Sequence, residues 1–310
     1  MLPEVNTDEE WDRVVGDEAI MQPAVEDLCA RLGLAGAPLT RFPAGSQPVY
    51  AVGDAHVLKL FPGAAARDGI AEARVLRHLE GRLPLATPRV HDAGPYENGW
   101  RHILMSRLPG EDLAVAWPRI PRAGRERIVA EAAGTLAALH ALDPAPLADA
   151  LGPADWSGFV AEQRAGVVER QRALGLAEHW LAQIPAFLDA APPHDRASPT
   201  QPALLHTEFM REHLLVEPGA GRRLTGLLDF EPAMIGDRAY DFVAVGLYVT
   251  RAEPGLFDLF TKEYGRTFDS HQLLAYTLLH VYGNLSRYLR ELPAPPEPTL
   301  GALAETWFGR

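Results

Sequence analysis

The stretch between residues 204 and 231 places the strongest constraint on how this chain can fold. Two short apolar runs, 214–216 and 224–228, flank the turn-forming sequence Glu-Pro-Gly-Ala-Gly, a pattern that predicts a β-hairpin. Side chains that can bind a metal ion or move a proton stand just outside the two strands. They are His206, Glu208 and His213 before the first strand and Asp229 and Glu231 after the second. Because a hairpin brings the open ends of its strands together, we expect these side chains to gather.

Such a set of side chains is what phosphoryl transfer from a nucleotide requires. One carboxylate positions the attacking hydroxyl group, while a second carboxylate and a neutral ligand hold the magnesium ion that bridges the phosphates. Carboxylates and imidazoles are both present at the strand ends. The hairpin therefore predicts a site for nucleotide-dependent phosphoryl transfer.

The same stretch resembles the catalytic segment of the aminoglycoside phosphotransferase family, antibiotic kinases with a protein-kinase-like fold. The family pattern HGDxxxxN, a strand, a turn and IDW or IDF corresponds here to HTExxxxH and then LLDFE. Glu208 stands at the position of the catalytic Asp, and His213 stands at that of the metal-binding Asn. The resemblance implies that Glu208 orients the hydroxyl group and accepts its proton, while His206 braces the catalytic loop. It also implies that His213 and Asp229 hold Mg²⁺ and that Glu231 reaches a second metal ion.

Composition limits the classes of partner. The chain has 310 residues, 47% of them hydrophobic, which is enough for one large domain or two lobes. A formal charge of −12 argues against nucleic acid, whose recognition needs clustered Lys and Arg. Cys29 is the only cysteine, so an internal disulfide is excluded. Residues 1–11 lack the apolar core of a secretory signal, and no apolar run reaches the roughly 20 residues that span a bilayer. We expect a cytoplasmic protein without a membrane partner.

Residues 1–105 are expected to form an N-terminal nucleotide-binding lobe. The apolar repeats of residues 24–32 and 66–80 predict helices. Short runs separated by turn residues predict a five-stranded antiparallel sheet, with strands at 39–42, 48–52, 56–61, 89–93 and 102–106. The resemblance thus implies an α+β, bilobal fold with this sheet and its helix in the first lobe.

Lys59 and Glu72 form the second candidate group. Lys59 lies in the middle of an apolar strand, and Glu72 lies on the apolar stripe of the helix that follows. A buried carboxylate needs a partner, and Lys59 is the nearest candidate in the chain. In the kinase template such a lysine, braced by the helix carboxylate, reaches the α and β phosphates. The alternative is that Glu72 reaches the edge of the stripe and Lys59 faces water.

Two loops complete the nucleotide site that the resemblance implies. Gly45 and Ser46 lie between the first two strands, where the backbone could cover phosphates, although an ordinary turn has the same composition. Met105 and Ser106 precede a Pro-Gly break that we interpret as the hinge between lobes. In the family this hinge holds the base of ATP or GTP through backbone hydrogen bonds.

Residues 106–310 are expected to form a larger, mostly helical catalytic and substrate-binding lobe. The apolar patterns predict helices at 122–142, 256–264 and 271–290 and two more within 156–191. The family pattern GDxxYD, present here as GDRAYD at 236–241, implies that Asp241 braces the catalytic loop, and Asp237 is expected to cap a helix. His140 is interpreted as a histidine favoured by the dipole at a helix C-terminus.

The function implied is transfer of the γ-phosphoryl group of ATP or GTP, with Mg²⁺, to a hydroxyl group of an antibiotic, conferring resistance. The segments VLKLF at 57–61 and AYTLLH at 275–280 resemble hygromycin B kinases. The antibiotic would be an aminoglycoside such as hygromycin or a nucleoside such as capuramycin. One alternative is a metabolic kinase of the same fold, acting on choline, homoserine or a sugar. The other is an inactive nucleotide-binding module, since HTE replaces HGD.

Overall fold

The computed structural model describes residues 2–43, 45–191, 201–219 and 222–309, and it divides the chain into two compact units. The first unit comprises Met1–Pro109 and Gly226–Pro232. The second unit comprises Gly110–Thr225 and Ala233–Arg310. The polypeptide therefore returns once to the first unit, through the short segment that contains Asp229 and Glu231.

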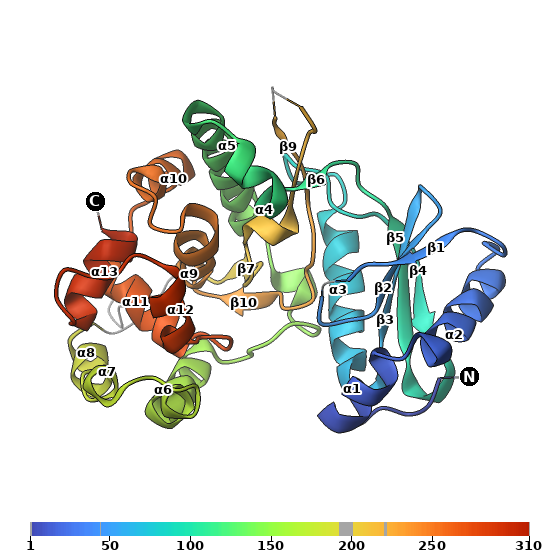
Figure 1. Ribbon diagram of the computed structural model, residues 1–310, viewed down its shortest axis with the longest axis horizontal. Coiled ribbons are helices and arrows are strands. Elements are labelled where there is room, and N and C mark those ends of the chain that lie inside the picture. The colour runs from blue at the N-terminus through green and yellow to red at the C-terminus, as the bar shows by residue number, and fades with distance from the viewer. Residues whose placement is uncertain (1, 44, 192–200, 220–221, 310) are drawn as a thin grey trace. The chain divides into compact units, whose positions relative to one another are not determined.

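The first unit is built on a five-stranded antiparallel sheet, as predicted (Figure 1). The spatial order of the strands is β1-β2-β3-β5-β4. Their bounds are Leu39–Arg41 for β1, Val49–Val52 for β2, His56–Phe61 for β3, Val90–Pro95 for β4 and Arg101–Ser106 for β5. In this register Lys59 lies opposite Val49 on one side and Ile103 on the other.

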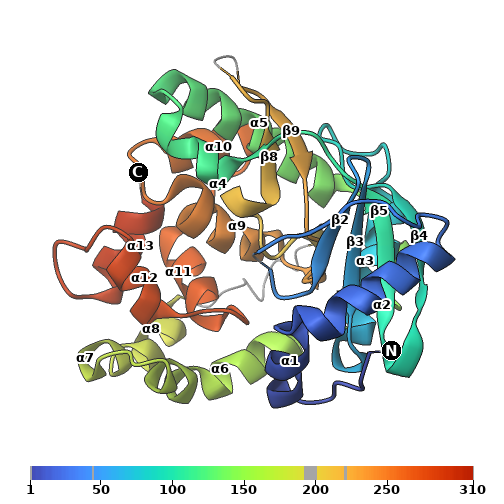
Figure 2. The same ribbon diagram turned by 45° about the vertical axis from the view of Figure 1, so that its right-hand side comes forward.

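Three helices cover this sheet: α1 (Asp8–Val15), α2 (Glu18–Arg31) and α3 (Ala66–Leu79). The predicted helices correspond to α2 and α3, whereas the short, polar α1 was missed. The start predicted for α2 was wrong because Asp17 caps the helix earlier, its Oδ1 accepting a hydrogen bond of 2.9 Å from the amide of Ala19. Figure 2 shows α2 and α3 on opposite faces of the sheet.

The alternation of side chains along β3 decides where Lys59 points. Leu58 and Leu60 belong to the hydrophobic core that α2 shares with the sheet. Side chains at alternate positions of a strand face opposite ways. Lys59 and Phe61 therefore face α3, where Phe61 lies so close to Gly69 that a Cβ atom there would meet its ring at 2.8 Å.

The second unit is mostly helical, as predicted, and α5 packs beside α10 (Figure 1). Its helices are α4 (Leu113–Ala116), α5 (Arg122–Ala141), α6 (Trp156–Ala173), α7 (Glu178–Leu181), α8 (Ile184–Ala190), α9 (Asp241–Ala244), α10 (Leu256–Tyr264), α11 (Ser270–Leu279), α12 (Leu285–Glu291) and α13 (Leu300–Phe308). Strand β7 (Ala203–Leu205) pairs with β10 (Met234–Gly236). A second small sheet has the order β6-β8-β9, with bounds Glu111–Asp112, Leu214–Val216 and Leu224–Leu227.

The hairpin predicted from the sequence is present as β8 and β9. The amide of Glu217 donates a hydrogen bond of 2.9 Å to the carbonyl oxygen of Arg223 and closes the strand pair. Turn residues 220 and 221 lie outside the described residues. The boundary between the two units runs through β9, after Thr225.

Two helix predictions in the second unit were wrong. The region 271–290 forms α11 and α12 rather than one helix, because Asn284 caps α12, its Oδ1 accepting a hydrogen bond of 2.9 Å from the amide of Arg287. The region 156–191 contains three helices instead of two. There α6 ends before Gly175, whose φ of +80° lies in the left-handed region that favours glycine.

No helix among the described residues is both long and apolar enough to cross a membrane.

The packing of α13 against the segment after α9 yields a first prediction. A Cβ atom at Gly246 would meet Cε1 of the buried Phe308 at 2.2 Å. Overpacking of a core costs about 1–3 kcal/mol, so Gly246→Ala should lower the free energy of unfolding by that amount. Urea denaturation measures this difference.

The matched control is Gly134→Ala, within α5, where a Cβ atom would meet nothing within 4 Å. Alanine is the better helix former, so this variant should be more stable by up to about 1 kcal/mol. Equal effects of the two substitutions would contradict the packing described for Phe308.

Candidate active site

Lys59 is the centre of a cluster of charges in the first unit. Its Nζ lies 2.8 Å from Oε2 of Glu72, 2.8 Å from Oδ1 of Asp229 and 2.9 Å from Oε2 of Glu231. The side chains of Lys59 and Glu72 are only 6% and 2% exposed. The predicted pair of Lys59 and Glu72 is therefore present, and the alternative that Lys59 faces water is wrong.

The charges of this cluster do not balance. Burial by itself would lower the pKa of Lys59, but the three carboxylates outweigh it and hold that pKa well above its usual value. Burial raises the pKa of Glu72 to about 7, and Asp229 and Glu231 add to this effect against the opposing influence of Lys59. Three carboxylates facing one ammonium group leave a surplus of negative charge.

This surplus fits a divalent cation. Oxygen atoms of Glu72, Asp229 and Glu231 all lie within 4.8 Å of one another. Mg²⁺ prefers carboxylate oxygens and is usually bound by one or two of them together with phosphates. The donor set of the first unit is thus suited to the metal that the sequence predicted, although Glu72 was expected only as the partner of Lys59.

The loop between β1 and β2, predicted at residues 44–47, contributes one side chain to which the sequence prediction gave no role. Nε2 of Gln47 donates a hydrogen bond of 2.9 Å to Oε1 of Glu231. Gly45 and Ser46, the predicted phosphate-covering residues, directly precede Gln47 and are exposed. Gly45 has a φ of +123°, which favours glycine. In the sequence, Gln47 is one of several polar or small residues in the turn before an apolar strand. That position alone did not indicate that its side chain would contact Glu231.

Met105 and Ser106, the predicted base-binding residues, end strand β5. Met105 is buried, 6% exposed, and is paired with Val57 on β3. The hydroxyl group of Ser106 accepts a hydrogen bond of 2.9 Å from the amide of Arg89. The first unit ends shortly afterwards, at Pro109.

Asp241, at the start of α9, organises residues 206–208 of the second unit, which the sequence predicts to be the catalytic loop. Its Oδ2 accepts a hydrogen bond of 2.9 Å from the amide of His206, and its Oδ1 accepts one of 2.6 Å from the amide of Thr207. Burial would raise the pKa of Asp241, but the hydrogen bonds from His140 and the loop amide lower it below its usual value. The predicted bracing role of Asp241 is confirmed.

His140 lies in the last turn of α5, as predicted, but it also makes contacts that the dipole interpretation did not include. His140 is buried, with Nε2 lying 2.9 Å from Oδ2 of Asp241 and Nδ1 lying 2.8 Å from the hydroxyl group of Tyr264. It therefore supports the residue that holds the predicted catalytic loop. The available signal was its spacing, because His140 follows the buried Leu136 by one helical turn and so shares the apolar face of α5.

Thr207 occupies the position at which the family pattern has glycine, and its backbone shows why glycine is used there. Thr207 is fully buried and has a φ of +72°, a conformation that costs a β-branched residue of the order of 1–3 kcal/mol. The hydrogen bonds that the amides of His206 and of Thr207 itself donate to Asp241 hold this strained residue in place. The expected N-cap Asp237 is also confirmed, because its Oδ1 accepts from the amide of Ala239 at 2.9 Å.

Glu208 and His213, the predicted base and metal ligand, lie in the same unit as Asp241. Nδ1 of His213 lies 2.9 Å from the carbonyl oxygen of Glu208, so Nδ1 carries the proton. A neutral imidazole in this tautomer presents Nε2 as a lone-pair donor, which is the arrangement of metal-binding histidines. Glu208 lines a small hollow together with aromatic side chains that include Tyr248 and Tyr282.

The five polar residues at the hairpin ends are divided between the units. Asp229 and Glu231 lie with Lys59 in the first unit, whereas His206, Glu208 and His213 lie in the second. That all of them form one site stays a prediction.

The raised pKa of Glu72 predicts how stability depends on pH in EDTA without nucleotide. A carboxyl group whose pKa rises from 4.5 to about 7 on folding binds its proton more tightly in the folded state. Its contribution to the free energy of unfolding therefore falls as pH rises from about 4.5 to about 7, by roughly 1–3 kcal/mol. Urea denaturation of the wild type and of Glu72→Gln at pH 5 and pH 7.5 should show that the variant lacks this fall in the free energy of unfolding. The change of that free energy with pH is the slope compared below.

The control is Glu263→Gln, which changes an exposed carboxylate on α10 and should keep the wild-type slope. If Glu72→Gln also kept that slope, the electrostatic account of the Lys59 cluster would be wrong.

Comparison with known proteins agrees with the geometry. A sequence model of the phosphotransferase enzyme family matches residues 38–276. Among solved structures, the GDP complex of aminoglycoside 2'-phosphotransferase-IIIa has a TM-score of 0.69 at 18% identity, covering 83% of this chain and 88% of that one.

Two further structures share the fold. The macrolide 2'-phosphotransferase MphH from Brachybacterium faecium has a TM-score of 0.61 at 23% identity, covering 86% of this chain and 91% of that one. The streptomycin-ATP complex of APH(2")-IIa has a TM-score of 0.60 at 17% identity, covering 84% and 91%. These likenesses confirm the predicted fold, and the family match extends over most of the sequence. The chain belongs to the phosphotransferase enzyme family.

Proposed function

We propose that this phosphotransferase is a small-molecule kinase that transfers the γ-phosphoryl group of ATP or GTP to a hydroxyl group of an antibiotic. The observation that carries the proposal is the buried Lys59 among Glu72, Asp229 and Glu231. The structural relatives support the substrate classes, since one is bound to GDP, one to streptomycin and ATP, and one is a macrolide phosphotransferase. We place the protein in the cytoplasm, where both nucleotides are available.

In this proposal the first unit binds the nucleotide. Lys59, held in place by Glu72, donates hydrogen bonds to the α and β phosphates. The backbone of Gly45 and Ser46 covers the phosphates, and the backbone at Met105 and Ser106 binds the base. Lys59, Met105 and Ser106 lie on strands of the sheet, so little ordering of these residues is left for the moment of binding.

Asp229 and Glu231 are the proposed metal ligands of the first unit, and His213 is the proposed ligand from the second. Mg²⁺, when bound, neutralises the charge of the β and γ phosphates. The phosphates would at the same time take over hydrogen bonds of Lys59 that the carboxylates now receive.

Glu208 is the proposed catalytic carboxylate of the second unit. It accepts the proton of the attacking hydroxyl group and keeps that group in line with the γ phosphate. Asp241 fixes the loop that carries Glu208 by holding the amides of His206 and Thr207. His206 thus acts as a positioning residue, through its backbone.

The experiment that tests the function is a phosphotransfer screen with ATP and with GTP. The acceptors are aminoglycoside, macrolide and nucleoside antibiotics, with choline, homoserine and sugars as the metabolic set. Transfer to an antibiotic is the expected outcome. Transfer to the metabolic set alone would replace the proposal with a metabolic kinase, and nucleotide binding without any transfer would identify an inactive module.

Asp229→Asn should abolish transfer while the protein still folds, because an amide cannot neutralise the metal ion. The measurement is turnover with the best acceptor, with thermal melting as the folding check. Asp258→Asn changes an exposed carboxylate on α10 and should leave turnover intact. Full turnover by Asp229→Asn would refute the metal assignment.

Glu208→Gln should lower kcat by two or more orders of magnitude, which is the usual contribution of a general base. Glu212→Gln is the matched control, since it alters an exposed glutamate on the same segment. A loss of less than about fivefold would leave Glu208 without a role in proton transfer.

A further inference from the structure

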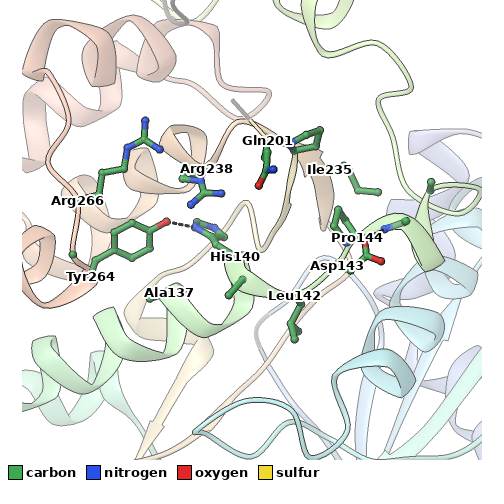
Figure 3. A pocket seen from close by; sticks show the side chains of 15 residues that line it. Ala137, His140, Leu142, Asp143, Pro144, Gln201, Ile235, Arg238, Tyr264 and Arg266 are labelled. Atoms are coloured by element: carbon green, nitrogen blue, oxygen red, sulfur yellow. Dashed lines mark hydrogen bonds between the residues drawn. The ribbon is translucent and has the colours of Figure 1, made fainter. Parts of the chain in front are cut away.

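The second unit contains a pocket that the proposed function does not use. It has a volume of about 810 Å³, and α5, β10 and α10 contribute to its walls together with the segments that follow α5 and α10. Figure 3 shows His140 at its centre, between a polar side and an apolar side. The hollow beside Glu208 is a separate feature, because the two share no lining residue.

The polar side of this pocket carries positive charge. Arg238 and Arg266 both line it, near Gln201 and Tyr264 (Figure 3). Nε of Arg238 is buried and has no hydrogen-bond partner among the described residues. Neither arginine forms an ion pair within the part of the chain that the structure describes, although the guanidinium group of Arg266 lies over the ring of Phe268. A buried guanidinium donor without an acceptor costs free energy that an anion would recover.

The opposite side of the pocket is largely apolar, and Asp143 lies on the same side (Figure 3). Leu142, Pro144 and Ile235 lie there in Figure 3. Asp143 is the one carboxylate that lines the pocket among the described residues, and its Oδ1 already accepts a hydrogen bond of 3.0 Å from the amide of Ala145. The walls therefore suit a molecule with an anionic group at one end and an apolar body at the other.

A chain of hydrogen bonds connects this pocket with the catalytic loop. The tautomer of His140 follows from its partners: Asp241 is an acceptor, so Nε2 donates to it and Nδ1 accepts from the hydroxyl group of Tyr264. Asp241 in turn holds the loop amides of His206 and Thr207. Arg238 lies beside Tyr264 and acts on its hydroxyl group both through its charge and as a hydrogen-bond donor.

Each donor in this chain polarises the next one. The positive charge of Arg238 makes the Tyr264 hydroxyl group a stronger donor to His140, and this strengthens the bond from His140 to Asp241. An anion that pairs with Arg238 would cancel that influence. The catalytic loop would then be held less firmly.

We propose that this pocket is a regulatory site for an amphipathic anion, a carboxylate or phosphate with an apolar body. Arg238 and Arg266 bind the anionic group, and Leu142, Pro144 and Ile235 contact the apolar body. Occupation loosens the catalytic loop through Tyr264, His140 and Asp241. The proposal goes beyond the proposed kinase activity and does not depend on it.

The first test uses 2-naphthoate as the probe and isothermal titration calorimetry as the measurement. An anion of about 13 non-hydrogen atoms should bind with a Kd near 1 mM or below. The neutral 2-naphthamide should bind the wild type at least about tenfold more weakly than naphthoate does, because a charged hydrogen bond is lost. For the same reason naphthoate should bind Arg238→Gln at least about tenfold more weakly than it binds the wild type. Arg290→Gln, an exposed arginine on α12, should bind naphthoate as the wild type does.

Arg266→Gln provides the same comparison if Arg238→Gln does not fold, which thermal melting reveals. No binding of naphthoate at several millimolar would overturn the proposal. Equal binding of the acid and the amide would overturn it as well.

The second test measures hydrogen exchange in peptides that contain residues 203–209, with and without saturating naphthoate. Exchange of the loop amides should become about threefold faster or more when the pocket is filled. Unchanged or slower exchange, with naphthoate bound, would overturn the connection to the catalytic loop. This readout requires no acceptor and no turnover, so it stays informative even if the kinase proposal fails.

Discussion

The burial of a single ammonium group among three carboxylates is the interaction on which the rest of the structure depends. Lys59 can occupy this position only because β3 turns it toward α3, away from the hydrophobic core that Leu58 and Leu60 help to form. Removing charges from water is costly, and an incompletely neutralised cluster is costlier still. A protein that folds for stability alone gains nothing from this arrangement. A protein that binds a divalent cation and phosphates there recovers the cost on binding.

The second unit shows a similar concentration of polar groups around Asp241. This fully buried carboxylate receives hydrogen bonds from two loop amides and from His140, so its charge is compensated by oriented donors. The same bonds hold Thr207 in a left-handed conformation that a β-branched residue otherwise avoids. Fixing a loop in this way prepares it before the reaction begins, which is how preorganised sites gain rate. The connection from Asp241 through His140 to Tyr264 means that the loop can be influenced from the pocket behind it.

Sequence patterns predicted those features that local rules determine. The strands and the hairpin followed from alternation and turn residues, and the pairing of Lys59 with Glu72 followed from a carboxylate on an apolar stripe. What the sequence did not show depends on contacts between distant segments. The partners of His140 come from α9 and α10, far along the chain, and Gln47 meets Glu231 only because residues 226–232 return to the first unit. The break between α11 and α12 was missed because apolar periodicity continues across it.

The central claim is that Lys59 binds nucleotide phosphates beside a metal ion, and calorimetric titration of Mg²⁺ with ATP and with GTP tests it most directly. The chain has only two lysines, Lys59 and Lys262, which makes a matched pair of variants possible. Lys59→Arg keeps the positive charge among the carboxylates but replaces the compact ammonium group with the larger, planar guanidinium group. It should weaken nucleotide binding by about tenfold or more, while the exposed Lys262→Arg should bind as the wild type does. Unchanged affinity in Lys59→Arg would contradict the account.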